Sequence, residues 1–382
     1  MNSKQRVFAS LAGVEPDRVP IGEFAIDFDT VERLLGHETY LRAKAKSQIA
    51  FWEGRHDEVA ESYIKDHIAL HEKLDLDIVT FAPSACWRIP PESDDPPPRR
   101  TGPDTWEDKY GRVYRFSAAS QDITCVHDPV ADAEVLSVAD FERPLDPPVR
   151  DERSWRIVDT VTQRFKGEKF ICGPSGGEIG MVMLGGLERG CRRLRRQPDV
   201  VRAATRRLLA EQNAADELYV HPDSDGVLWY DDFAHNTGPF ISPVLFRDLF
   251  FDANRARVVR LQERFGKKIF KHCCGNIRQL HGLFLELGYD AYQSIQGSAG
   301  MELATLKREL GGRMTLWGGV AVENLIAGTP EDVRADVRRA LAIGRPGGRF
   351  ILGASHSIAV GTQYDNYLAM LDEYHRLCDS TS

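Results

Sequence analysis

The chain has 382 residues, of which 42% are hydrophobic and 28% are charged, and its formal net charge is −8. These values are typical of a globular protein with a substantial core, and the negative charge argues against a nucleic-acid or anionic-membrane partner. The first residues, MNSKQRVFASL, are too short and too polar for a signal peptide, and no segment offers the ~18 apolar residues of a membrane span. Seven irregularly spaced cysteines indicate reduced thiols, so we expect a cytoplasmic protein.

Short apolar runs that alternate with helical patterns predict the fold. The expected strands are 18–24, 77–81, 169–173, 226–231, 268–273, 291–295, 314–318 and 349–353. Helices are expected at 187–220, at 242–265 and from Thr329 onward, the last two opening with a capping residue and a proline. Eight strands alternating with helices predict a single (β/α)8 TIM-barrel domain over residues 1–382. An open doubly wound sheet is the alternative, but no glycine-rich dinucleotide loop follows the first strand.

A long insertion, residues 86–153, interrupts this alternation after the second strand. It is polar and rich in proline, and residues 105–116 have the pattern of a hairpin with Tyr110 and Gly111 at the turn. An insertion of this length predicts a lid over the barrel or an interface element, and a homodimer is one expectation that follows.

Polar side chains follow the expected strands at the points where the strands end. They are Glu23, Glu178, Asp231, Asp232, His272, Cys274, Gln296 and His356. The carboxyl ends of barrel strands form one rim, where active sites are built. Carboxylates, imidazoles and a thiol should therefore converge there. We expect substrate contacts from Glu23, Gln296 and Asn276 on this rim.

The sequence KHCCGN at the end of the fifth strand suggests a metal site. Side chains alternate along an extended segment, so His272 and Cys274 should point the same way and Cys273 the opposite way. An imidazole and a thiolate at this spacing suit Zn²⁺, and Gly275 lets the chain turn away. The alternative is a hydrogen-bonded core histidine beside a small buried cysteine.

The acids of the rim have both functional and structural interpretations. Asp231 and Asp232 can both reach the rim only if the strand has already ended, and they could serve as a general base or a metal ligand, or only as a cap or an ion pair. Glu178 could be functional or could be an acid in the first turn of a helix. The remaining cysteines are interpreted as structural: Cys86, Cys125, Cys172, Cys191 and Cys378.

Several motifs, weak singly, form a specific pattern in this order. They are Arg18-Val19-Pro20, TWEDKYGRVYR, DGVLWYDDF, ISPVLFRDLF, KHCCGN, WGGVAVENLIAGTPEDV and GGRFILGASHSIAVGTQYDNYLAML. With these motifs the chain resembles the uroporphyrinogen decarboxylase superfamily over nearly its whole length. The resemblance implies a distorted (β/α)8 barrel, in agreement with the strand count.

The resemblance implies two chemistries. Some members decarboxylate a tetrapyrrole without a metal, and others are zinc methyltransferases that work with a corrinoid on a thiol or a methoxy compound. The zinc members resemble this chain in an H-x-C-G motif, here His272, Cys274 and Gly275, but their next ligand is a cysteine where this chain has His356. The decarboxylases also have a histidine there. Their arginine-rich stretch after the first strand corresponds here to residues 21–27, which hold two acids and no arginine, and this argues against uroporphyrinogen as substrate.

We therefore predict a zinc-dependent methyl- or alkyltransferase that acts on a small molecule, with a corrinoid on a partner protein as the candidate methyl donor. His272, Cys274 and His356 are the expected zinc ligands. Asp232 or Glu178 is expected as an exchangeable fourth ligand, and these two acids and Asp231 are the expected catalytic residues. The alternative is a metal-free decarboxylase of a smaller carboxylate, in which His356 orients the substrate. A non-catalytic member that uses the insertion to bind a partner is a third hypothesis.

Overall fold

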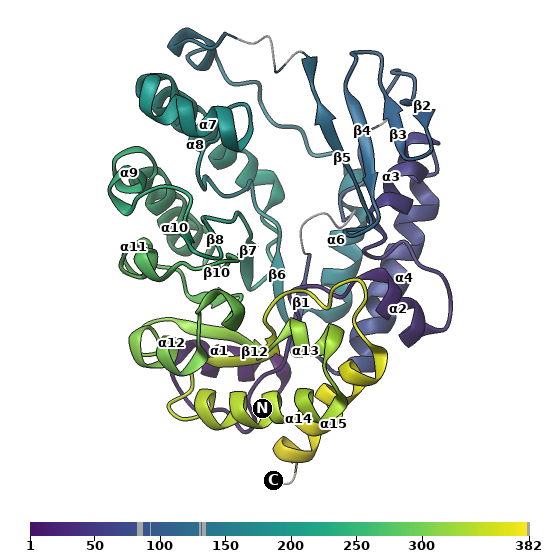
Figure 1. The fold of residues 1–382 in the computed structure, drawn as a ribbon, viewed down its shortest axis with the longest axis vertical. Coiled ribbons are helices and arrows are strands. Elements are labelled where there is room, and N and C mark those ends of the chain that lie inside the picture. The colour runs from purple at the N-terminus through teal and green to yellow at the C-terminus, as the bar shows by residue number, and fades with distance from the viewer. Residues whose placement is uncertain (82–86, 92, 130, 132–134, 380–382) are drawn as a thin grey trace.

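The computed structural model describes residues 1–81, 87–91, 93–129, 131 and 135–379 (Figure 1). In this part of the chain, seven parallel strands form a curled central sheet in the order β1-β6-β7-β10-β11-β12-β13. They are β1 (Ile78–Thr80), β6 (Phe170–Gly173), β7 (Gly226–Trp229), β10 (Lys268–His272), β11 (Ala291–Gln293), β12 (Thr315–Val320) and β13 (Phe350–Ala354). Nearly all their residues are buried, as expected for a parallel sheet covered on both faces. The predicted TIM-barrel-like fold is confirmed.

The first predicted strand, residues 18–24, is wrong as a regular strand. Its backbone is bonded to β13 through Gly22 N–H to Leu352 O, 3.0 Å, and Leu352 N–H to Pro20 O, 2.8 Å. On its other side Ile21 O accepts from Asp77 N–H at 2.7 Å, just before β1. Proline has no N–H to donate, which limits this pairing to isolated bridges. The segment nevertheless joins the two edges of the sheet.

Alternate residues of the strands form the inside of the barrel. Ile78, Phe170, Phe270 and Trp317 belong to one buried cluster, whereas their strand neighbours pack outward in the large cluster under the helices. Helix α1 (Ser3–Ala12) contributes to the inner cluster. Helix α1 forms hydrogen bonds with residues just before β6 and at the start of β13. It therefore covers the amino-terminal end of the strands and leaves their carboxyl ends for a site.

Helices surround the sheet (Figure 1). Besides α1 they are α2 (Phe28–Leu35), α3 (Lys44–Trp52), α4 (His56–Leu74), α6 (Glu152–Phe165), α7 (Gly186–Arg196), α8 (Pro198–Tyr219), α9 (Pro243–Phe246), α10 (Asp252–Phe265), α11 (His281–Leu287), α12 (Leu303–Glu309), α13 (Val322–Ala327), α14 (Pro330–Gly344) and α15 (Tyr364–Asp379). None of the helices in the described ranges is long and apolar enough to cross a membrane.

The predicted helix caps are confirmed, and one segment predicted as a single helix forms two helices. The Ser242 side chain accepts from Leu245 N–H at the start of α9, and Thr329 forms a capping box with Asp332 before α14. The helix predicted at 187–220 is broken at Gln197, because Pro198 begins α8 as its first residue.

The insertion forms a separate antiparallel sheet. Its strands are β2 (Arg99–Gly102), β3 (Thr105–Glu107), β4 (Val113–Ser117) and β5 (Asp122–His127), in sequential order. The predicted hairpin is confirmed as β3 and β4, with Gly111 at φ +78° in the turn. The next turn reaches the barrel, since Ala45 N–H at α3 donates to Gln121 O at 3.2 Å. The insertion thus touches the barrel close to the carboxyl ends of the strands.

The cysteines differ in their surroundings. Cys172, Cys273 and Cys378 are buried, Cys191 is half-buried, and Cys125, also interpreted as structural, is exposed on β5. Cys86 lies outside the described residues.

Candidate metal centre and adjoining cavities

His272, the last residue of β10, is held by the neighbouring strand. The register pairs it with Gln293 of β11, and Gln293 Oε1 is hydrogen-bonded to His272 Nδ1. Phe24 stacks on the imidazole with ring centroids 4.0 Å apart. Burial lowers the pKa of His272 to about 3. The imidazole is therefore neutral, and its Nε2 lone pair is available to a metal.

Cys274 lies beside His272, as the alternation of side chains predicted. Its Sγ is 3.3 Å from His272 Nε2. Its N–H donates to Asp232 Oδ1 at 2.7 Å, and burial raises the pKa of the thiol to about 12, with Asp232 adding to the effect. Cys273 points the opposite way into the core, where its Sγ accepts from Phe233 N–H.

Gly275 makes the turn after this pair possible. Its φ is +80°, and a Cβ at this position would lie 2.7 Å from His235 O. Both the left-handed backbone and the close approach require glycine. The predicted role of Gly275 as the turning residue is confirmed.

His356 follows β13 and completes a group of three. Its Nδ1 is 2.9 Å from Ser357 Oγ, and burial lowers its pKa. One potential ligand atom from each of His272, Cys274 and His356 lies within 4.8 Å of the other two. The structure thus brings together the three residues predicted as metal ligands, while their role as ligands stays a prediction.

Ser294, which sequence reasoning missed, links the strand ends that carry this group. It is a non-glycine residue at φ +88°. Its hydroxyl donates to Ser355 O at 2.9 Å and lies 3.8 Å from Cys274 Sγ. Strained backbone is retained where the surrounding structure fixes it, often at functional sites. Nothing in the sequence pattern signals a positive φ at a serine.

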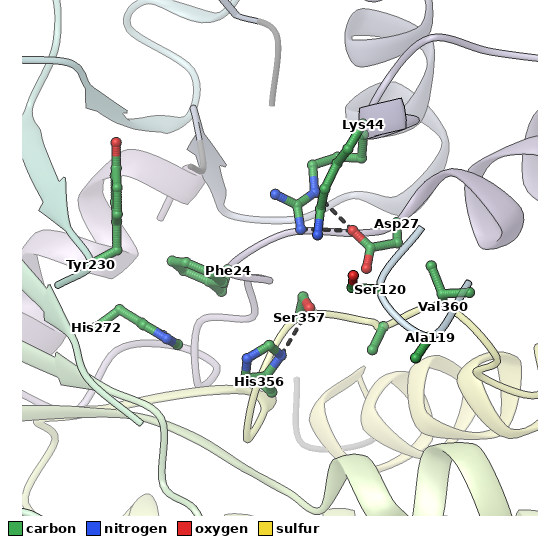
Figure 2. Close-up of a pocket in the computed structure, with 12 residues that line it drawn as sticks. Phe24, Asp27, Lys44, Ala119, Ser120, Tyr230, His272, His356, Ser357 and Val360 are labelled. Atoms are coloured by element: carbon green, nitrogen blue, oxygen red, sulfur yellow. Dashed lines mark hydrogen bonds and ion pairs between the residues drawn. The ribbon is translucent and has the colours of Figure 1, made fainter. Parts of the chain in front are cut away.

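A cavity of about 310 Å³ opens beside the two histidines (Figure 2) and is called the main cavity because it adjoins the predicted metal ligands. It is lined by Phe24, Asp27, Arg42, Lys44, Ala119, Ser120, Tyr230, His272, His356, Ser357, Ala359 and Val360. Ala119 and Ser120 lie in the β4–β5 turn of the insertion. The insertion therefore forms part of the cavity wall, as a lid would, and Figure 2 shows these two residues on the side away from Tyr230.

Cationic side chains on the cavity wall were also missed. Arg42 is paired with Asp27, Nη2 to Oδ1 at 2.7 Å, and both are buried. Lys44 lies 3.9 Å from Asp122 of the insertion. The sequence reasoning looked for arginine only within residues 21–27. The chain instead supplies its cations from the loop before α3 and from the first residue of that helix.

Glu178 lies in a loop after β6, so its interpretation as an acid in a helix's first turn is wrong: α7 begins only at Gly186. Its Oε2 is 2.7 Å from Lys271 Nζ, and both side chains are buried. Lys271 also donates to Asp231 O at 2.6 Å. Burial raises the pKa of Glu178 to about 7, against the lowering effect of Lys271. This ion pair holds Glu178 away from the metal group, so a role as fourth ligand is not supported.

The two aspartates have separate positions. Strand β7 ends at Trp229, before them, and both are exposed, as their placement on the rim requires. Asp232 supports Cys274 through its backbone N–H. Asp231 lines a second cavity with Glu178 and Tyr230. Of the two, only Asp232 contacts the metal group.

Glu23 does not line the main cavity. It is buried, its Oε2 accepts from Ala354 N–H at 3.1 Å, and it borders a small space of about 30 Å³ beside His67. Burial raises the pKa of Glu23 to about 8, and its Oε1 has no hydrogen-bond partner among the described residues. Its contact is with the backbone of Ala354, two residues before His356, and its role as a substrate contact stays a prediction.

The other two predicted substrate contacts lie at the turn after β10, and their role toward a substrate stays a prediction. Gln296 Oε1 accepts from Gly275 N–H at 2.8 Å, and Asn276 Oδ1 accepts from Arg278 N–H at 3.1 Å. Neither residue is in the wall of the main cavity. Their position is explained by the tight turn after β10.

Comparison with known proteins gives a family and a fold. The uroporphyrinogen decarboxylase (URO-D) family model matches residues 118–377. A search of curated proteins finds no match. Among solved structures, the chain is similar to a methyltransferase from Methanosarcina mazei, with a TM-score of 0.64, 16% sequence identity and coverage of 99% of each chain. At this identity the similarity shows the fold alone.

Proposed function

The chain belongs to the uroporphyrinogen decarboxylase family, and from this premise we propose that it is a zinc-dependent enzyme that transfers a methyl or other small alkyl group. His272, Cys274 and His356 would hold the zinc. The acceptor or donor would be a small thiol or methoxy-type molecule in the main cavity, and a corrinoid on a partner protein is the candidate exchange partner for the methyl group.

The observation that carries this proposal is the fit of the three side chains to tetrahedral zinc. Bonds of roughly 2.0–2.3 Å place two ligand atoms of a tetrahedron about 3.5 Å apart. His272 Nε2 and Cys274 Sγ are 3.3 Å apart, and all three potential ligand atoms are within 4.8 Å. Gln293 binds the other ring nitrogen of His272, as acceptors behind zinc-bound histidines commonly do.

The residues around the group have distinct roles in this proposal. When bound, Zn²⁺ lowers the pKa of a coordinated thiol or water and stabilises the deprotonated nucleophile. Cys274 must lose its proton on metal binding, so affinity should fall at low pH. Phe24 fixes the His272 ring and excludes water from one side of it. Asp232, whose Oδ1 accepts from Cys274 N–H at 2.7 Å, would serve as the exchangeable ligand after a side-chain rotation.

A metal-free decarboxylase is the second candidate, and one observation favours it. Arg42 and Lys44 line the main cavity, and Figure 2 shows Lys44 across it from His272 and His356. Each cation already has an acidic neighbour, Asp27 or Asp122, with which a substrate carboxylate would compete. In this alternative His356 would orient the carboxylate to be lost, and Asp231 or Asp232 would stabilise a developing positive charge.

Metal analysis of the purified chain tests the leading proposal. After metal-replete expression we expect about one zinc per chain, and less than about 0.2 would contradict the proposal. Chelator competition should show that Cys274→Ser weakens zinc binding by more than about 100-fold, which exceeds the usual loss for a residue that only hydrogen-bonds to a metal ligand. The exposed Cys125 provides a matched control, since Cys125→Ser should leave affinity unchanged.

His356 separates the two candidates. If it is a ligand, His356→Ala should weaken zinc binding by about 10-fold or more. If the variant keeps wild-type zinc affinity, the ligand assignment fails. Activity that persists in strong chelator and in Cys274→Ser would support the decarboxylase.

A further inference from the structure

A second cavity of about 170 Å³ lies next to the main one, with Tyr230 in the wall of both. It is bounded by residues that follow β1, by residues at the ends of β6 and β7 and just after them, and by α8. Its lining residues are Phe81, Trp87, Gly173, Pro174, Ser175, Gly177, Glu178, Gln212, Leu228, Trp229, Tyr230 and Asp231. One water needs about 10–15 Å³ of such space, so the cavity admits a small organic group.

The cavity combines aromatic rings with an unpaired acid. Phe81, Trp87, Trp229 and Tyr230 are in its wall, and the indole N–H of Trp229 is already bound to Ser175 Oγ at 3.2 Å. The Arg257 guanidinium also lies 6.0 Å from the Trp229 ring centroid. The π-faces and edges offered to a ligand are therefore mainly those of Phe81, Trp87 and Tyr230. Grouped aromatic rings attract cations, and quaternary ammonium groups above all.

The charges of the cavity leave one negative group without a counter-ion. Glu178 is paired with Lys271 behind the wall, and none of the described lining side chains is cationic. Asp231 has no side-chain hydrogen bond or ion pair to any described residue. Its carboxylate packs close against Gly180, where a Cβ would lie 2.3 Å from Asp231 Oδ2 and where φ is +58°. An organic cation would supply the missing charge.

Gln212 adds an independent sign of a ligand. The residue is 8% exposed, and its Nε2 donates to Glu178 O at 2.6 Å. Its Oε1 has no hydrogen-bond partner among the described residues. A buried acceptor left unpaired costs free energy, and a ligand N–H or a polarised N-methyl group could satisfy it.

We infer that this second cavity binds an organic ammonium group, with Asp231 as its counter-ion and the rings as its apolar wall. In the proposed transfer reaction, the ammonium group would belong to the substrate. Only this step of the inference rests on the proposed function. Tyr230 would lie between that group and the reacting end near His272 and His356. Asp231 would then be a substrate-binding residue instead of a general base.

Binding of small probes to the full-length chain tests the inference. Calorimetric titration should compare choline, ethanolamine and 3,3-dimethylbutan-1-ol, the neutral isostere of choline. We expect choline to bind about 10-fold more tightly than the neutral alcohol. Asp231→Asn should weaken choline binding about threefold or more and leave the alcohol unaffected. Asp252→Asn, which removes an exposed acid outside the cavity, is the matched control.

The outcomes are separable from those of the zinc experiment. Choline binding should persist in Cys274→Ser, because that residue is not in the wall of the second cavity. Equal affinity for choline and its neutral isostere, or choline affinity unchanged by Asp231→Asn, would overturn the inference. Ethanolamine binding as tightly as choline would support the inference and would assign the larger part of the binding free energy to the acceptors Gln212 and Asp231. A preference for choline would also support the inference and would assign the larger part to the aromatic rings.

Discussion

Replacement of Lys271 by methionine should destabilise the protein in a strongly pH-dependent way. Lys271 and Glu178 are both buried and 2.7 Å apart. The change removes the ammonium group that lowers the pKa of Glu178 and leaves a buried carboxyl group without a counter-ion among the described residues, with only the hydrogen bonds from Tyr289 and the Asp231 N–H. Breaking one side of a buried ion pair typically costs 3–5 kcal/mol, since the remaining charge is uncompensated.

The pH dependence follows from the protonation of Glu178. Its pKa is raised from 4.5 to about 7 in the folded chain. The protonated form therefore favours folding below pH 4.5, and this contribution, about 3 kcal/mol at about 1.4 kcal/mol per pH unit, is lost as the pH rises through about 7. Without Lys271 the pKa of Glu178 rises further. At pH 5 the variant holds a proton on Glu178 at little cost, whereas at pH 8 it must either keep that proton above the ordinary pKa of a carboxyl group or carry the charge unpaired, and either costs free energy.

Urea unfolding at pH 5 and pH 8 measures the effect. We expect Lys271→Met to cost about 3–5 kcal/mol at pH 8 but only about 1–2 kcal/mol at pH 5, where hydrogen bonds and packing are lost. Lys268→Met on the same strand is the control. Its partner Asp290 is 3.1 Å away, but Lys268 is 40% exposed, so the cost should be under about 1 kcal/mol at both pH values. An equal loss at both pH values for Lys271→Met, or no recovery at pH 8 when Glu178→Gln is added, would refute the reasoning.

Three further predictions concern the site and its support. Gln293→Leu should weaken zinc binding about 10-fold in chelator competition, because the His272 ring loses the acceptor that orients it; unchanged affinity would contradict the proposed geometry. Gly275→Ala should cost more than about 2 kcal/mol in urea unfolding, since a Cβ at φ +80° would lie 2.7 Å from His235 O; a neutral result would show that the turn relaxes. Burial raises the pKa of Glu23 to about 8, so its protonated form favours folding and that contribution is lost as the pH rises from about 4.5 through 8. Glu23→Gln should remove this pH-dependent loss of stability. The difference in melting temperature, variant minus wild type, should therefore be larger at pH 8 than at pH 5.

Local pattern was enough to predict most of the fold. Seven of the expected strands are present because buried parallel strands are short apolar runs that end at glycine or polar residues. The pairing of His272 with Cys274 followed from the two-residue repeat of an extended chain. The segment 18–24 failed as a regular strand because Pro20 has no N–H to donate, so only isolated bridges form.

The sequence by itself determined which polar residues end the strands, and the tertiary structure decided which of them meet. His356 reaches His272 and Cys274 because β13 and β10 end on one rim, whereas Glu178 is held by Lys271, a residue with no distinguishing pattern. Arg42, Tyr230 and the insertion's Ser120 reach the main cavity from segments far apart in the chain. Local periodicity fixes the direction of a side chain along its own strand, but distances between segments are set by sheet closure and helix packing, which depend on contacts remote in sequence.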